Sequence, residues 1–245
     1  MFTALLARLK QRHRTFKYPD GAPPPLPERF RGCPVIDPAK CSGCADCAKV
    51  CPTGAISLPA ARKIDLGKCI FCGACQEACG RNAINFAQDF QLGEFTRQAL
   101  LKETGVTCTP PEKKKHIFSR SLKLRQVCAG GCNACEADTN VLQTIGWDLS
   151  RFGIQFVASP RHADGLLITG PVTKNMRLAL EKTYAAVAQP KLVIVVGSCA
   201  ISGGVFAGHP EQDNGVEGII PIDMYIPGCP PHPLTILEGL LRLRG

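Results

Sequence analysis

The sequence predicts a small α+β domain followed by a larger α/β domain with a parallel, doubly wound sheet. Two observations carry this prediction. A cysteine-rich segment occurs twice between residues 41 and 86, and apolar strands alternate with helices after residue 121. Because the chain has 245 residues and 45% of them are apolar, each domain can bury a core of its own.

Residues 1–31 are expected to form a peripheral arm. The apolar run at its start has about six residues and is broken by Arg8, which is too short for a signal sequence or a membrane span. Leu5, Leu6 and Leu9 could share one face of a short helix, and the following "PDGAPPPLPERFRG" disfavours regular structure. Two interpretations stay open: a solvated arm, or an arm that docks on a membrane subunit or on anionic lipid headgroups.

Residues 32–90 contain an internal repeat. "CSGCADCAKVCPTGAISL" begins at Cys41 and "CIFCGACQEACGRNAINF" begins 28 residues later, and each reads C-x2-C-x2-C-x3-C. This spacing is typical of ferredoxins with two 4Fe–4S clusters, in which the fourth cysteine of each run ligates the other cluster. The predicted ligands are Cys41, Cys44, Cys47 and Cys79 for the first cluster, and Cys51, Cys69, Cys72 and Cys75 for the second.

Alternatives to these clusters are a pair of zinc sites or a disulfide domain, and two matching runs of four cysteines disfavour both. One departure from the repeat is that Pro52 follows Cys51 whereas Gly80 follows Cys79, which removes no ligand. Cys33 and Cys108 have no counterpart in the repeat, so we expect them to stand alone as non-ligands.

The cysteine usage and the charge also indicate metal chemistry. Fifteen cysteines in a chain without a signal sequence favour metal ligands in a reducing cytoplasm. The formal charge of +9 would suggest a nucleic-acid partner. An oxidised cubane with four thiolates carries about −2, however, so three clusters would bring the chain near +3. We therefore expect no nucleic-acid binding.

Residues 91–121 are predicted to be a linker. The segment "FQLGEFTRQALLKET" is compatible with a short helix, and "CTPPEKKKHIF" reads as a turn followed by a solvated charged run.

Residues 122–245 alternate between strand and helix patterns. The expected strands are 122–129, 154–159, 164–170 and 191–199, and residues 224–231 are expected to form a short strand that runs into a turn. The expected helices are 139–153, 174–189 and 233–243. Thr139 or Asn140 would cap the first helix and Gly153 would end it. Apolar strands that alternate with helices predict a parallel sheet of the flavodoxin-like, doubly wound kind.

Four cysteines follow the strands of this second domain. Cys132 and Cys135 follow the first strand, Cys199 follows the apolar "LVIVV" run of the fourth, and Cys229 follows the "YIP" of the fifth. The carboxyl ends of parallel strands meet at one edge of the sheet, where such folds bind ligands. We predict a third 4Fe–4S cluster there. Buried structural thiols, a redox dithiol at the C-x-x-C pair, or a zinc site are the alternatives.

The segments "GGCNACEAD", "VGSCAISGGVF" and "IPGCPPHPLTILEGLL" resemble the small subunit of membrane-bound, energy-converting NiFe hydrogenases, including the formate hydrogenlyase type. The resemblance runs from about Leu124 to Leu243 and extends to the terminal-cluster subunit of complex I. It implies ligands at Cys132, Cys135, Cys199 and Cys229, and none at Cys128. Complex I subunits carry two adjacent cysteines at the first position, so the separated C-x-x-C favours the hydrogenase side.

The first half is similar to the partner ferredoxin subunit of those hydrogenases, on the segments "FRGCPVIDPAKCSGCADC", "CIFCGACQEAC" and "FQLGEF". The two subunits look fused here, and a later cysteine-rich segment of the ferredoxin subunit is absent. The resemblance implies an oxidoreductase subunit that passes electrons through three clusters to or from a NiFe site on a separate large subunit. This chain alone is not expected to carry out hydrogen chemistry.

The implied partners are that large subunit, membrane ion-translocating subunits, and a donor or acceptor such as a formate or carbon monoxide dehydrogenase or a ferredoxin. The implied location is the cytoplasmic face of a membrane, as a peripheral part of a complex. Two other functions stay open: a complex-I-like assembly that reduces quinone without nickel, and a non-enzymatic iron–sulfur redox sensor. Glu136, next to Cys135, either faces the large subunit or is an ordinary exposed carboxylate.

Overall fold

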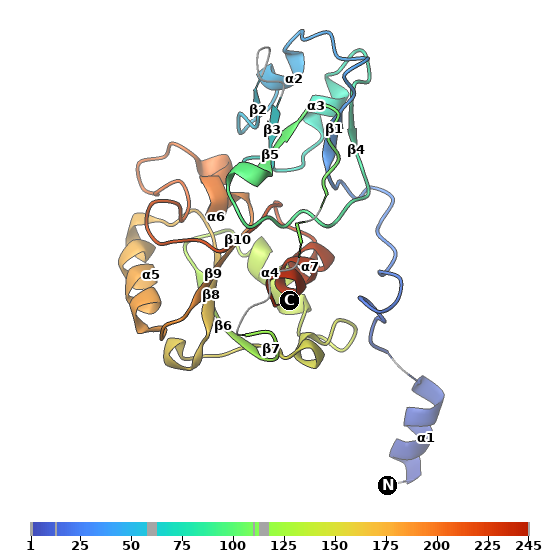
Figure 1. The fold of residues 1–245 in the computed structure, drawn as a ribbon, viewed down its shortest axis with the longest axis vertical. Coiled ribbons are helices and arrows are strands. Elements are labelled where there is room, and N and C mark those ends of the chain that lie inside the picture. Colours follow the sequence, from blue (N-terminus) through green and yellow to red (C-terminus); the bar gives the residue numbers. More distant parts are fainter. Residues whose placement is uncertain (1, 13, 58–62, 110, 113–117, 245) are drawn as a thin grey trace.

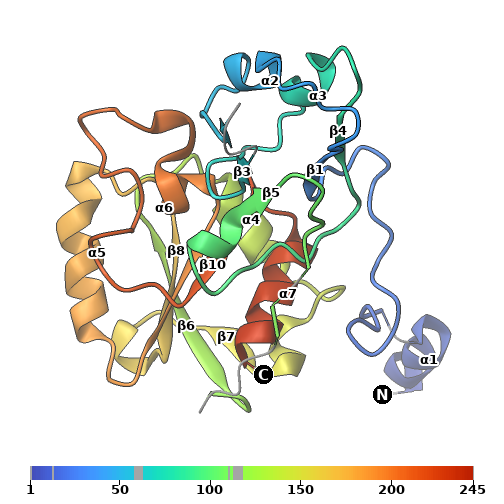
Figure 2. The same ribbon diagram turned by 45° about the horizontal axis from the view of Figure 1, so that its top comes forward.

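The computed structural model describes residues 2–12, 14–57, 63–109, 111–112 and 118–244. A small domain of short strands sits on one end of a larger α/β domain, and the N-terminal helix stands away from both (Figures 1 and 2). None of the helices in these ranges is both long and apolar enough to pass through a bilayer.

The N-terminal arm is a helix followed by an irregular segment. Helix α1 (Phe2–Gln11) ends at Arg12, whose φ of 51° is left-handed. The chain is then fixed to the α/β domain at Phe16. The Phe16 N–H donates to the Gly146 carbonyl at 2.9 Å, and the Phe16 ring meets Trp147 edge to face.

The small domain folds as two interleaved halves, one from each copy of the repeat. Its elements are β1 (Pro34–Ile36), α2 (Asp46–Lys49), β2 (Ile56–Ser57), β3 (Lys63–Asp65), α3 (Ala74–Glu77) and β4 (Ile84–Phe86). Strand β1 pairs antiparallel with β4, so the start of the domain lies beside the end of the second copy. The buried Ile56 and Ile84 occupy equivalent positions of the two copies, and both face the core.

The predicted linker contributes to this small domain. One turn of 3-10 helix, η1 (Gln98–Leu100), leads into β5 (Leu101–Glu103), which pairs antiparallel with β3. The expected helix is therefore a single turn and a strand, because Leu100 is buried and the chain continues along the open edge of β3. Most of the expected charged run, residues 113–117, lies outside the described residues.

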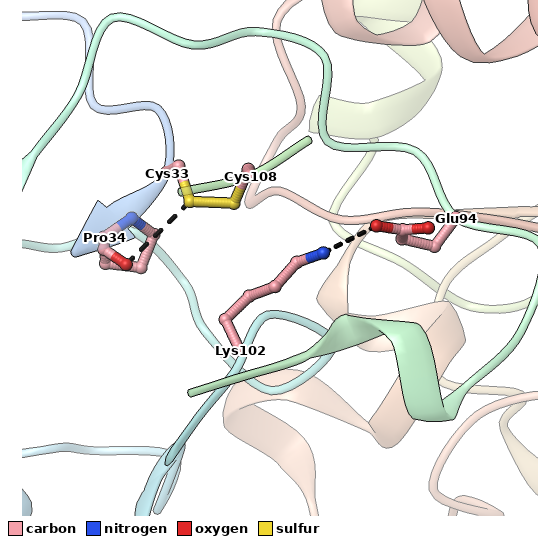
Figure 3. The surroundings of a disulfide bond; sticks show 5 residues. All are labelled: Cys33, Pro34, Glu94, Lys102 and Cys108. Atoms are coloured by element: carbon pink, nitrogen blue, oxygen red, sulfur yellow. Dashed lines mark hydrogen bonds and ion pairs between the residues drawn. A yellow bond between two sulfur atoms is a disulfide. The ribbon is translucent and has the colours of Figure 1, made fainter. Parts of the chain in front are cut away.

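Cys33 and Cys108 form a disulfide with their Cα atoms 5.8 Å apart (Figure 3). Both residues are buried. The expectation that they stand alone is therefore wrong, although their pairing agrees with the prediction that they are not cluster ligands. The bond ties the middle of the predicted linker to the start of the small domain, near the Lys102–Glu94 ion pair at 2.6 Å.

The α/β domain has a five-stranded parallel sheet. Its elements are β6 (Leu122–Cys128), α4 (Ala134–Val141), η2 (Leu149–Phe152), β7 (Ile154–Phe156), η3 (Pro160–His162), β8 (Gly165–Thr169), α5 (Lys174–Ala186), β9 (Leu192–Val196), α6 (Ser198–Ser202), η4 (Gly204–Phe206), β10 (Met224–Ile226) and α7 (Pro233–Arg244). The strand order is β7-β6-β8-β9-β10, with every neighbouring pair parallel. This is the flavodoxin-like order, and the parallel sheet agrees with the predicted α/β class.

Strands β8, β9 and β10 are buried on both faces, whereas β6 and β7 have exposed residues. On β9, Val193 and Val195 face the core that contains Leu180 of α5, whereas Ile194 and Val196 face the core formed with α7. The first of these cores continues into the small domain and includes its Ile36, Ile56 and Leu66 together with Ile201 of α6. The two domains are therefore packed on one another through a shared apolar core.

The predicted helix 139–153 differs from the observed one. Helix α4 begins at Ala134, directly after Asn133 in a left-handed conformation with φ of 70°. Thr139 lies inside the helix, where its hydroxyl donates to the Cys135 carbonyl at 2.7 Å, rather than at an N-cap. Gly153 does end a helical turn, but that turn is the short η2.

Candidate iron–sulfur sites

The first predicted ligand set lines one cavity. Cys41, Cys44, Cys47 and Cys79 surround a volume of about 280 Å³ beside α2. Three of these cysteines come from the first copy of the repeat and Cys79 comes from the second, as the ferredoxin spacing predicts. Ala45, with φ of 66°, starts α2 from a left-handed turn, which wraps the loop around the cavity.

The second predicted set lines a neighbouring, smaller space of about 20 Å³. Cys69, Cys72 and Cys75 of the second copy meet Cys51 of the first there. Burial raises the pKa of Cys69 to about 12 and that of Cys75 to about 11. Because metal-bound cysteines are thiolates, metal binding at this site would release protons.

The two fourth cysteines make equivalent hydrogen bonds. The Ala55 N–H donates to Cys51 Sγ at 3.3 Å, and the Ala83 N–H donates to Cys79 Sγ at 3.2 Å. The second bond is the largest cause that holds the pKa of Cys79 below its ordinary value. The repeat thus gives each fourth cysteine a backbone donor four residues later, which stabilises a thiolate.

The third predicted set follows the carboxyl ends of strands β6, β9 and β10. The pKa of Cys135 is raised, and burial is the largest cause. The neighbouring charges act in the same direction, namely those of Glu136, Cys199, Cys229 and Cys132. Burial, with Cys229 and Cys132, raises the pKa of Cys199 to about 11. Cysteines that lie up to 97 positions apart thus come within electrostatic range of one another.

Glycines keep the backbone close to these thiols. A Cβ on Gly197 would lie 2.5 Å from Cys135 Sγ, and the φ of 92° at this position also disfavours other residues. A Cβ on Gly204 would lie 2.8 Å from Cys199 Sγ. Cys128, at the end of β6, is exposed.

The chemistry of all three sets suits an iron–sulfur cluster. Each set consists of four thiols, the soft donors that select iron–sulfur clusters, zinc or copper(I). Within the described residues, no group of three or more His, Cys, Asp or Glu side chains is arranged so that it could hold a metal ion. The cavity of about 280 Å³ at the first set has room for a larger group.

Serine hydroxyls join the second ligand loop to the third. The Ser198 hydroxyl, beside Cys199, donates to the Cys69 carbonyl at 2.6 Å and also lies 3.1 Å from the Gly228 carbonyl. One turn later, the Ser202 hydroxyl donates to the Gly67 carbonyl at 2.9 Å. Ser198 is fully buried, so these contacts are inside the domain interface.

A partly buried ion pair also holds this loop. Arg97 makes a bidentate pair with Asp65, at 2.8 Å and 2.5 Å. The Asp65 carboxylate also accepts the Gly67 N–H at 2.9 Å, and the Asp65 carbonyl accepts the Cys69 N–H at 2.9 Å. The position of Cys69 relative to α6 is therefore set by several short hydrogen bonds.

Two acidic residues near the third set are buried or half-buried. Glu136 is 6% exposed and accepts a hydrogen bond from the Thr169 hydroxyl at 2.5 Å, so it is not an ordinary exposed carboxylate. Asp138, which no motif of the sequence singled out, lines a cavity of about 290 Å³ with Arg31, Cys229 and His232. Burial raises the pKa of Asp138. Its one-turn spacing from Cys135 on a helix was the signal available in the sequence.

Residues 132–243 match the protein family described as NADH ubiquinone oxidoreductase, 20 Kd subunit, and residues 33–80 match the 4Fe-4S dicluster domain. The probable membrane-bound hydrogenase subunit mbhJ of Pyrococcus furiosus is 41% identical over 125 residues, which cover 51% of this chain and 75% of the relative. The chain belongs to the 20 Kd subunit family. The resemblance found in the sequence is thereby confirmed.

Other relatives in the family carry two kinds of name. Formate hydrogenlyase subunit 7 of Escherichia coli is 42% identical, over 52% of this chain and 50% of the relative. An NADH-quinone oxidoreductase subunit of Citrifermentans bemidjiense is 43% identical, over 46% of this chain and 66% of the relative. A solved structure, the membrane-bound sulfane sulfur reductase, an archaeal respiratory membrane complex, gives a TM-score of 0.47 at 34% identity, over 52% of this chain and 70% of the matched chain.

The family membership and the dicluster match establish the general class of the protein. It is an iron–sulfur, electron-transfer subunit of an oxidoreductase complex of the membrane-bound hydrogenase and complex I kind. Identities of 41–43% to relatives of both kinds do not separate hydrogenase from quinone chemistry.

Proposed function

We propose that this chain relays electrons through three 4Fe–4S clusters in a membrane-associated NiFe hydrogenase complex of the formate hydrogenlyase type. The NiFe site would be on a separate large subunit. The observation that carries the proposal is the presence of three four-cysteine sets on one chain, with the second and third joined by the Ser198 hydrogen bond. Bound 4Fe–4S clusters supply one-electron chemistry.

The residues of the chain have distinct tasks in this function. The twelve predicted cysteines bind the clusters as thiolates, and backbone amides such as those of Ala55 and Ala83 stabilise the bound form. The shared apolar core excludes water between the domains. The separated Cys132 and Cys135 support the hydrogenase assignment, because complex I relatives are expected to have adjacent cysteines there.

The proposal includes partners and a location. The third set, at the exposed carboxyl edge of the sheet, would face the large subunit, and the ferredoxin domain would receive or deliver electrons at the other end. A formate or carbon monoxide dehydrogenase or a soluble ferredoxin fits that role. Membrane ion-translocating subunits would hold the complex on the cytoplasmic face.

Iron analysis tests the cluster count. Anaerobic purification should give about twelve irons per chain, and Cys199→Ala should remove one reduced-cluster EPR signal and leave the ferredoxin pair. About eight irons in the native chain, or an unchanged set of signals in the variant, would contradict the third cluster. Stoichiometric zinc would favour a structural site.

A quinone-reducing, complex-I-like assembly is the second candidate function, favoured by the 43% identity to an NADH-quinone oxidoreductase subunit. The sequence and nickel content of the co-purifying large subunit distinguish the two. Two C-x-x-C pairs and bound nickel would support the hydrogenase. Their absence would favour quinone chemistry, and incomplete clusters with no large-subunit partner would favour a redox sensor.

A further inference from the structure

Helix α1 presents an apolar face that packs against nothing in the described part of the chain. Phe2, Leu5, Leu6 and Leu9 are between 55% and 80% exposed, and no residue of the helix is buried. Their spacing places all four within one stripe of the helix, about 100° wide. By contrast, α7 buries ten of its twelve residues.

Basic residues border this stripe. At about 100° per residue, Lys10 lies about 40° beyond Leu6 on one side, and Arg8 lies about 60° beyond Leu5 on the other. Arg12, Arg14 and Lys17 follow, all exposed. The first acidic residue of the chain is Asp20, so the whole segment is cationic without compensation.

The position of the helix leaves this face accessible. Figures 1 and 2 both show α1 away from the two domains. The segment after the helix is nevertheless fixed to the α/β domain at Phe16, through the Gly146 carbonyl and the Trp147 ring. A surface that binds α1 would therefore also hold the two domains close to that surface.

We propose that α1 binds an anionic lipid surface, with its apolar stripe among the acyl chains and its basic residues at the headgroups. A helix of ten residues is about 15 Å long, so it lies in the plane of the interface rather than across the bilayer. Positive charge on both borders of the stripe complements anionic headgroups on both sides. The proposal rests on the proposed function only in one respect, namely that the lipid surface belongs to the membrane that carries the complex.

Binding of the full chain to protein-free vesicles tests this proposal. We expect co-sedimentation with vesicles that contain phosphatidylglycerol and little with phosphatidylcholine alone. Leu5→Gln with Leu9→Gln keeps the charge and should lower the partition coefficient by at least about tenfold. Arg8→Gln with Lys10→Gln should lower it by roughly 25-fold, at about fivefold for each cation.

Matched controls separate α1 from the rest of the surface. Leu178→Gln with Ile145→Gln removes two other exposed apolar side chains, and Arg161→Gln with Lys182→Gln removes the same charge elsewhere. Both double variants should bind the anionic vesicles as tightly as the native chain does.

Three results would overturn the proposal: no binding to protein-free vesicles, equal binding to neutral ones, or equal losses in α1 and control variants. Iron content and EPR signals are measured on the same samples. If they are normal while lipid binding fails, the lipid proposal falls and the electron-transfer proposal stands.

Discussion

Ser198→Ala removes a single hydroxyl from the contact between the second and third ligand loops. The Ser198 side chain is fully buried and donates to the Cys69 carbonyl at 2.6 Å. Alanine fills nearly the same volume, so the main effect is a buried carbonyl that loses its donor. Such a loss costs about 1–3 kcal/mol, which is roughly a 5- to 150-fold change in the unfolding equilibrium.

The matched control is Ser202→Ala, one helical turn away. It also removes a hydroxyl that bonds across the interface, but to the Gly67 carbonyl, two residues before the ligand Cys69. Both variants should lower the free energy of unfolding measured in urea. Only Ser198→Ala should change the magnetic coupling between the second and third clusters, because only Ser198 contacts the carbonyl of a predicted ligand and neighbours another.

Two measurements on anaerobic, cluster-loaded protein test the role of the Ser198 hydroxyl. Urea unfolding gives the stability, and EPR line broadening in the fully reduced state reports the coupling. An unchanged urea midpoint for Ser198→Ala would show that the hydrogen bond adds no net stability. Equal EPR changes in the two variants would refute the view that Ser198 specifically fixes the two ligand loops.

Three further predictions concern the disulfide, a glycine and a histidine. Replacing both Cys33 and Cys108 by Ala should lower the free energy of unfolding in urea by about 4 kcal/mol, because the disulfide closes a loop of 75 residues and restricts the unfolded chain. Alkylation of both cysteines in the native chain without prior reduction would contradict the disulfide. Gly197→Ala places a Cβ 2.5 Å from Cys135 Sγ and should reduce iron from about twelve to about eight per chain, while the two ferredoxin EPR signals persist. Burial lowers the pKa of His232 in the folded chain below its ordinary 6.5. As the pH falls below 6.5, the imidazole is therefore protonated more readily in the unfolded chain than in the folded one, and the free energy of unfolding decreases. His232→Asn keeps an acceptor for the Leu234 N–H and should flatten that dependence in urea unfolding; an unchanged slope would exclude His232 as its source.

Local patterns in the sequence predicted much of the architecture. The C-x2-C-x2-C-x3-C spacing gave the first two ligand sets, including the exchange of Cys51 and Cys79 between them, because the run is short enough for its geometry to be set by spacing alone. Alternation of apolar strands with helices gave the parallel sheet, because strands covered by helices on both faces must be apolar throughout. The ligand roles of all twelve cysteines remain predictions.

Other features could not be predicted from local patterns. The start of α4 at Ala134 depends on a left-handed Asn133, and propensity places that helix later. Strand β5 forms because the edge of β3 is open, and the Cys33–Cys108 bond joins residues 75 positions apart. Each of these depends on which segment reaches which surface, and no short-range preference encodes that.

The sequence by itself determined the class of each domain and the cysteines available to each site, because both follow from periodicity and spacing. Only the tertiary structure decided how the two domains meet. The Ser198–Cys69 hydrogen bond joins residues 129 positions apart, and the core around Ile201 contains side chains from both domains. Such contacts arise when two preformed surfaces fit together, so they depend on the shape of the whole chain rather than on any one segment.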